Sequence, residues 1–128
     1  MIYLDSSVLL ASLFRELRSP RAGLWDEELT SSRLLTYEVW IRLNAYGLAA
    51  SHGELASARL DRVDFVELSE RVLGRALLPY RVPVRTLDGL HLATAAYLRE
   101  QGEAVELASY DHRLVAGARA LGIPLAAL

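Results

Sequence analysis

Four carboxylates in this sequence stand where an α/β protein gathers its chemically active groups. Asp5 and Asp111 each follow a short apolar run directly. Glu38 falls about one turn into an amphipathic segment, and Asp88 falls in the first turn of another. Carboxylates that share a site oppose each other's ionisation, and an oxygen-preferring cation such as Mg²⁺ or Mn²⁺ relieves that conflict. Such an ion can activate water against a phosphodiester, so the implied chemistry is phosphodiester hydrolysis.

Each of these acids also has an ordinary structural explanation. Asp5 and Asp111 could cap the helices that follow them, and Asp88 could complement a helix dipole. Glu38 could pair with Arg42, four residues later on the same helix face. The joint placement favours convergence, because the carboxyl ends of parallel strands and the starts of the following helices share one edge of a sheet.

The elements that must position the acids alternate between strands and helices. Strands are predicted at residues 2–4, 64–68, 104–110 and 123–128, with a short strand or turn at 29–34. Helices are predicted at residues 6–17, 19–29, 34–49, 51–63, 69–80, 86–102 and 111–122, the sixth capped by Thr86 and stopped by Gly102. This order predicts one domain over residues 1–128, an α/β/α sandwich of three layers with a central, mainly parallel sheet.

The composition narrows the class of protein. With 52% hydrophobic and 23% charged residues the chain is globular, and no apolar run reaches the ~18 residues that span a bilayer. No signal-type segment opens the sequence and there is no cysteine, so we expect a cytoplasmic protein whose metal ligands are oxygen atoms. The net charge of -2 provides no global basic field, so a nucleic-acid partner would need local arginine clusters.

All 14 basic residues are arginine, and the chain has no lysine. Haloacid-dehalogenase-like phosphatases and response-regulator receivers also place an aspartate after the first strand, but both rely on a lysine. A phosphate-binding P-loop needs a lysine too. The missing lysine therefore argues against all three classes.

At the four acids the chain resembles PIN-domain ribonucleases, and in particular the VapC toxins of bacterial toxin–antitoxin pairs. The resemblance runs from residue 2 to about residue 125, and its third and fourth motifs are the specific ones. "YLDSSVLLA" is similar to the family's first motif, "SSRLLTYEVWIRL" to the second, "TLDGLHLATA" to the third and "ASYDHRLVAGARALGIPL" to the fourth. These motifs assign Asp5, Glu38, Asp88 and Asp111 as catalytic acids and metal ligands, with Ser6 as a hydroxyl neighbour and Ser109 where many relatives have threonine.

The resemblance implies Mg²⁺- or Mn²⁺-dependent endonucleolytic cleavage of structured RNA, inhibition by a VapB-like antitoxin, and a homodimer. The segment at residues 34–50 is apolar around much of its circumference and could supply the dimer seam or a groove for an antitoxin helix. Whether one or two metal ions bind stays open. The alternative is a non-catalytic PIN-like module that binds RNA or protein, which the retention of all four acids disfavours.

Several further residues could support such a site. Ser6 and Ser109 could hydrogen-bond the carboxylates or act as ordinary caps. A packed, hydrogen-bonded role is favoured for His91 over that of a catalytic base, while His112 could contact RNA or lie solvated on the surface. Arg15, Arg18 and Arg21 form a local basic cluster that could contact phosphates in a loop near the acids, or could be a solvated helix end.

Overall fold

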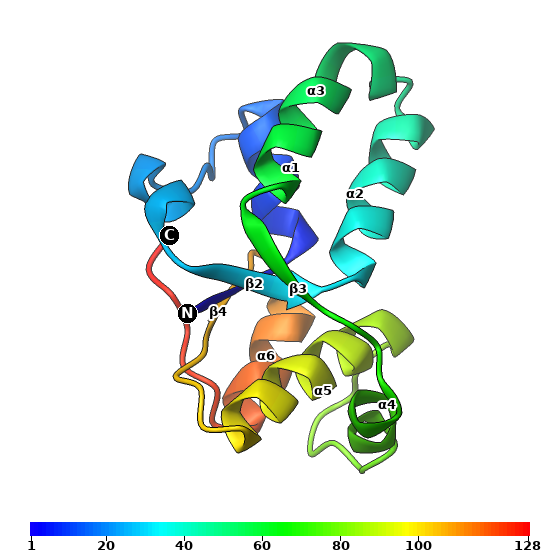
Figure 1. Cartoon of the computed structure of the whole chain (residues 1–128), viewed down its shortest axis with the longest axis vertical. Coiled ribbons are helices and arrows are strands. Elements are labelled where there is room, and N and C mark those ends of the chain that lie inside the picture. The colour runs from blue at the N-terminus through cyan, green and yellow to red at the C-terminus, as the bar shows by residue number, and fades with distance from the viewer.

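The computed structural model describes all 128 residues as a four-stranded sheet between two layers of helices (Figure 1). The strands are β1 (Ile2–Leu4), β2 (Leu29–Ser32), β3 (Val63–Val66) and β4 (Glu106–Ala108). The helices are α1 (Ser6–Phe14), α2 (Leu34–Ala45), α3 (Ala49–Leu60), α4 (Glu70–Ala76), α5 (Thr86–Glu100) and α6 (His112–Ala120), with a 3-10 helix η1 (Ala22–Asp26) before β2.

The sheet has the order β3-β2-β1-β4, and every pair of neighbouring strands is parallel. Ile2 pairs with Leu29 of β2 on one side and with Glu106 of β4 on the other. β1 is therefore central, and the residue that follows it lies at the middle of the sheet edge where the strands end.

Alternate side chains of β1 enter different cores. Ile2 and Leu4 pack into a cluster with residues of α1, α2 and α3, whereas Tyr3 packs into a second cluster with residues of α5 and α6. This is the period of two expected of a strand buried on both faces. Figure 1 shows α1, α2 and α3 on one side of the sheet and α4, α5 and α6 on the other. The predicted three-layer α/β/α sandwich with a parallel sheet is confirmed.

Three local predictions were wrong. Residues 19–28 form only the short η1, since this stretch buries just Leu24 and Trp25 and has no full apolar face to support a helix, and residue 29 already belongs to β2. Residues 123–128 make a single bridge between Leu125 and Leu107, because Pro124 has no N–H with which to extend a ladder. Thr86 is the first residue of α5 and not its cap.

The start of α5 has an unusual arrangement. Arg85 is the N-cap: its backbone is extended and its carbonyl accepts the N–H of Gly89 at 2.8 Å. The carboxylate of Asp88 then accepts the backbone N–H of Arg85 at 3.4 Å, which ties this acid to the first turn.

None of the helices combines the length and the apolar character needed to cross a membrane.

Candidate active site

The four predicted acids line one cleft of about 350 Å³ at the edge where the strands end. Asp5 directly follows β1, and Asp111 lies between β4 and α6. Glu38 enters from the second turn of α2, and Asp88 from the first turn of α5. The parallel sheet thus gathers side chains that are up to 106 positions apart in the sequence.

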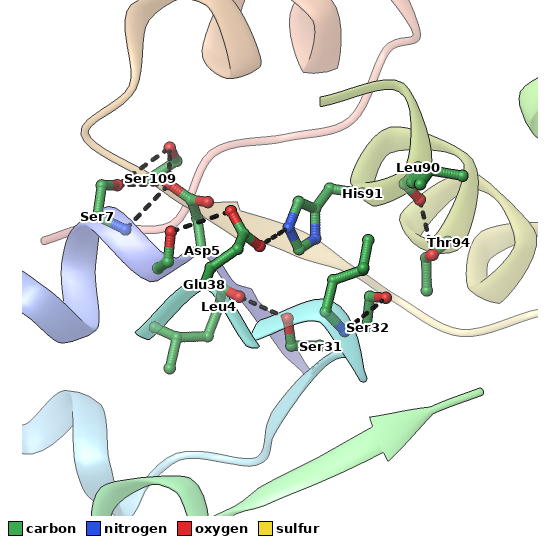
Figure 2. Close-up of polar contacts among 12 residues, drawn as sticks. Leu4, Asp5, Ser7, Ser31, Ser32, Glu38, Leu90, His91, Thr94 and Ser109 are labelled. Carbon is green, nitrogen blue, oxygen red and sulfur yellow. Dashed lines mark hydrogen bonds and ion pairs between the residues drawn. The ribbon is translucent and has the colours of Figure 1, made fainter. Parts of the chain in front are cut away.

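Asp5 is the most deeply placed of the four, with only 5% of its surface exposed. Its Oδ2 atom accepts hydrogen bonds from the backbone N–H of Ser7 (3.3 Å), the hydroxyl of Ser7, and the hydroxyl of Ser109 (2.8 Å). Figure 2 shows the carboxylate between these two serines. Its Oδ1 atom has no hydrogen bond and is accessible to solvent. One oxygen is fixed and the other is free.

In the other two aspartates, too, one carboxylate oxygen accepts hydrogen bonds and the other accepts none. Oδ1 of Asp111 accepts the backbone N–H groups of Arg113 (2.8 Å) and Leu114 (3.3 Å), while Oδ2 of Asp88 accepts that of Arg85. Asp5 and Asp111 therefore are helix caps, as the structural explanation proposed, and each still has a second oxygen for a ligand. The two interpretations do not compete.

Glu38 is held by a path of hydrogen bonds that begins in the core. The backbone N–H of Ser32 donates to the Tyr3 hydroxyl at 3.0 Å, and that oxygen lies 2.8 Å from Nδ1 of His91. Nε2 of His91 contacts Oε1 of Glu38, as Figure 2 shows, and the Ser6 hydroxyl donates to Oε2 at 3.3 Å. An Nε2–H group donates to Glu38 whether the ring is neutral or protonated. The alternative pair with Arg42 is not formed.

The tightest group of possible ligands contains Asp5, Glu38 and His91, with one atom of each lying within 4.8 Å of the others. Opposite ligands of Mg²⁺ lie about 4 Å apart, so little movement would bring carboxylate oxygens of Asp5 and Glu38 around one ion. Both nitrogen atoms of His91 are engaged with protein groups, which leaves carboxylate oxygens as the available donors. The donor set fits Mg²⁺ or Mn²⁺. Asp88 and Asp111 line the cleft outside this group.

The acids affect one another electrostatically. Burial raises the pKa of Asp5, against the hydrogen bonds of Ser7 and Ser109, and the charge of Glu38 raises it further. Burial also raises the pKa of Asp88, with additional increases from the charges of Asp111 and Asp5. For His91, burial lowers the pKa, but Glu38 and the nearby aspartates outweigh that effect and the net shift is upward. The cleft therefore favours a bound positive charge.

The supporting residues predicted from the sequence have different positions. Ser6 and Ser109 hydrogen-bond the acids, and His91 is packed at 2% exposure. Arg18 lies over the Tyr110 ring and lines a hollow that Asp111 also lines. The other three do not line the acidic cleft: Arg15 is the C-cap of α1, Arg21 pairs with Glu27, and His112 is exposed and lines a neighbouring hollow.

Sequence reasoning missed Tyr3 and Ser7. A tyrosine inside a three-residue strand that is otherwise aliphatic was a usable signal, because a buried hydroxyl requires a partner. Ser7 bonds both Asp5 and the backbone N–H of Tyr110 at 3.0 Å, so it joins the first and fourth motifs. Nothing in its own sequence position distinguishes it from Ser6.

The PIN-domain family model matches residues 2–120. The chain belongs to the PIN-domain family. It is 33% identical to Ribonuclease VapC47 of Mycobacterium tuberculosis over 95% of this chain and 93% of that one. It is 36% identical to Ribonuclease VapC46 of the same organism, over 98% of this chain and 96% of that one. The VapC-type resemblance seen in the four motifs is thus confirmed across nearly the whole sequence.

A solved structure described as a toxin–antitoxin complex from Klebsiella pneumoniae has the same fold. It superposes with a TM-score of 0.65 and 19% identity, covering 94% of each chain. At that identity the likeness supports the PIN fold, and the activity of this PIN domain has to be argued from its own cleft.

Proposed function

We propose that this PIN domain is a divalent-metal-dependent endoribonuclease that cleaves structured RNA and acts as the toxin of a type II toxin–antitoxin module. One observation carries the proposal: four carboxylates line a single cleft, and its three aspartates each keep one oxygen free of hydrogen bonds. The names of the curated relatives support the same reaction class.

Asp5 and Glu38 would hold the principal Mg²⁺ or Mn²⁺ ion, with Asp88 and Asp111 completing the acidic wall. When bound, the ion would supply activation of a water and stabilisation of charge on the phosphodiester. The chain's own part is positioning. Ser7 and Ser109 fix the orientation of Asp5, and the Tyr3–His91 path fixes that of Glu38, so both carboxylates are oriented before an ion binds.

The test is cleavage of structured RNA by the purified protein with EDTA, Mg²⁺ or Mn²⁺. We expect cleavage only with metal, and a loss of at least about 100-fold for Asp5→Asn or Asp88→Asn. Asp26→Asn is the matched control, because Asp26 is exposed in η1 and lies outside the cleft. Cleavage that persists in EDTA, or that survives both cleft substitutions, contradicts the proposal.

We also propose that a VapB-like antitoxin silences the enzyme and that the toxin is a homodimer. Tyr37 and Ile41 of α2, 57% and 48% exposed, together with Leu87 line the mouth of the cleft. Exposed apolar side chains at such a place favour a protein partner. Light scattering measures the dimer, and a sample that stays monomeric across a concentration series excludes it. Co-purification with an antitoxin encoded beside the toxin, and inhibition of cleavage by it, tests the partner.

A further inference from the structure

Two arginines adjoin the acidic cleft through their own backbone. The N–H of Arg85 donates to Asp88, and the N–H of Arg113 donates to Asp111 at 2.8 Å. Both arginines line one hollow of about 470 Å³, together with His112. Asp88 and Asp111 each accept a backbone hydrogen bond from an arginine that lines the neighbouring hollow.

The two arginines of this hollow form no ion pair within the chain. The three arginine–carboxylate ion pairs lie elsewhere and join Arg21 to Glu27, Arg33 to Glu67, and Arg75 to Glu100. Neither Arg85 nor Arg113 makes an ion pair or a side-chain hydrogen bond, and both are exposed. No carboxylate lines the hollow, whose remaining walls are Pro83, Val84 and Ala116. Two arginines without an ion pair, in a hollow that no acidic residue lines, are suited to an anion.

The hollow on the other side of Asp111 is less positive. Arg18 and Arg42 line it, but Glu16 and Asp111 line it as well, and Arg18 is already engaged with the Tyr110 ring. The fields of opposite charges in that hollow partly cancel. The distribution of charge around the cleft is thus asymmetric, with the unopposed cations on the side where α5 and α6 begin.

We propose that the hollow lined by Arg85, His112 and Arg113 is a phosphate-binding subsite for the RNA strand, next to the position where the strand is cut. This inference rests on the proposed function. It specifies the side of the cleft on which the RNA backbone next to the cleaved bond would lie. Guanidinium groups would grip phosphate oxygens through paired N–H donors and would position the strand without reading its bases. The bond that is cut would then lie over the four acids.

The test compares RNA binding by two double variants in an Asp5→Asn background, which keeps the RNA intact. Arg85→Gln with Arg113→Gln removes the hollow's charges. Arg71→Gln with Arg119→Gln is the matched control, because those arginines are exposed, make no ion pair, and lie on α4 and in the last turn of α6. Both doubles change the net charge equally. A short fluorescent RNA of mixed sequence is the probe, titrated over a range of salt concentrations.

We expect the Arg85/Arg113 double to bind about tenfold more weakly than the Arg71/Arg119 double near physiological salt. The slope of log affinity against log salt should become shallower by about 0.7 for each RNA phosphate that the protein no longer neutralises. Thermal unfolding of all variants checks that the fold is retained. In the active parent, the Arg85/Arg113 change should raise KM and leave kcat nearly unchanged, because the acids keep their backbone donors.

Equal RNA affinity and equal salt slope for the two doubles would overturn the inference while leaving the nuclease proposal intact. A second probe is an acidic polyglutamate peptide. If the Arg85/Arg113 double bound this peptide more weakly than the Arg71/Arg119 double but bound RNA equally well, the inference would also be overturned, since the hollow would then be a protein-docking site. Absence of RNA cleavage by the unsubstituted protein with metal would count against the nuclease itself, which separates the two failures.

Discussion

The hydroxyl of Tyr3 lies 2.8 Å from Nδ1 of His91, beneath the floor of the acidic cleft. The two rings meet edge to face with their centroids 5.8 Å apart, and Tyr3 is completely buried. Burial raises the pKa of the Tyr3 hydroxyl, against the hydrogen bond from the Ser32 N–H, so it stays protonated. A phenol in the central strand therefore orients the imidazole that holds Glu38.

Replacing Tyr3 with phenylalanine removes this hydroxyl and leaves the Ser32 N–H without a partner. We expect a loss of about 1–3 kcal/mol in the free energy of unfolding and a roughly tenfold lower affinity for Mn²⁺, because Glu38 would be less firmly oriented. Calorimetric titration with Mn²⁺ measures the second effect. Tyr97→Phe on α5 is the control, since the Tyr97 hydroxyl makes no hydrogen bond. Equal Mn²⁺ affinity for the two variants would show that the Tyr3 hydroxyl does not support metal binding.

Asp5 is expected to destabilise the metal-free protein at neutral pH. Burial raises the pKa of its carboxyl, so the stability that this group contributes is fully present below its unfolded pKa of about 3.9 and is lost as pH rises through the folded pKa. Asparagine carries no charge and still offers one oxygen to Ser7 and Ser109. In EDTA at pH 7, Asp5→Asn should therefore unfold a few degrees higher than the parent, since ~1 kcal/mol corresponds to about 4 °C.

The difference in unfolding temperature should shrink as pH falls through the raised pKa of Asp5, because the carboxyl of the parent then loses its charge. Adding Mg²⁺ should raise the unfolding temperature of the parent and leave that of Asp5→Asn nearly unchanged, because a ligand stabilises only the state that binds it. Scanning calorimetry across pH, with and without Mg²⁺, measures both effects. A parent that is more stable than the variant in EDTA at pH 7 would show that the serine hydrogen bonds outweigh burial.

Ser109 links the two aspartates that follow β1 and β4. Its hydroxyl donates to Asp5 at 2.8 Å and accepts the backbone N–H of Asp111 at 3.0 Å. Ser109→Ala should lower RNA cleavage by about 10-fold or more, because Asp5 loses an orienting donor. Ser109→Thr keeps the hydroxyl and should retain most of the activity. Similar losses for both variants would show that space, and not the hydroxyl, matters at this position.

Gly117 allows α6 to approach α5 closely. A Cβ added there would lie 2.4 Å from Cδ1 of Leu92, whose side chain is 1% exposed and has little room to move. Gly117→Ala should lower the free energy of unfolding by about 1–3 kcal/mol. Gly74→Ala in α4 meets nothing within 4 Å and should be neutral or stabilising by about 0.5–1 kcal/mol. Urea denaturation compares them, and an undestabilised Gly117→Ala would mean that Leu92 repacks freely.

The sequence by itself determined the parallel α/β fold and the four acids. Short apolar runs that end on Asp5 and Asp111 predict strands ending at one sheet edge, and helical spacing places Glu38 and Asp88 at helix starts on that edge. Those signals are local, so they can be recognised without knowing which other residues each segment contacts in the folded chain. Local signals failed at residues 19–29 and 123–128, where the amount of buried surface and a missing N–H donor decided the outcome.

Only the tertiary structure decided which oxygen of each aspartate carboxylate accepts hydrogen bonds and which is left for a ligand. Which oxygen of Asp5 is free depends on Ser109, 104 positions away, and whether Glu38 pairs with Arg42 or with His91 depends on where α5, on the other face of the sheet, places His91. The same holds for Arg85 and Arg113, which share a hollow only because α5 and α6 begin side by side. Hydrogen bonds and charges act through space over a few ångströms, and the folded chain alone sets those distances.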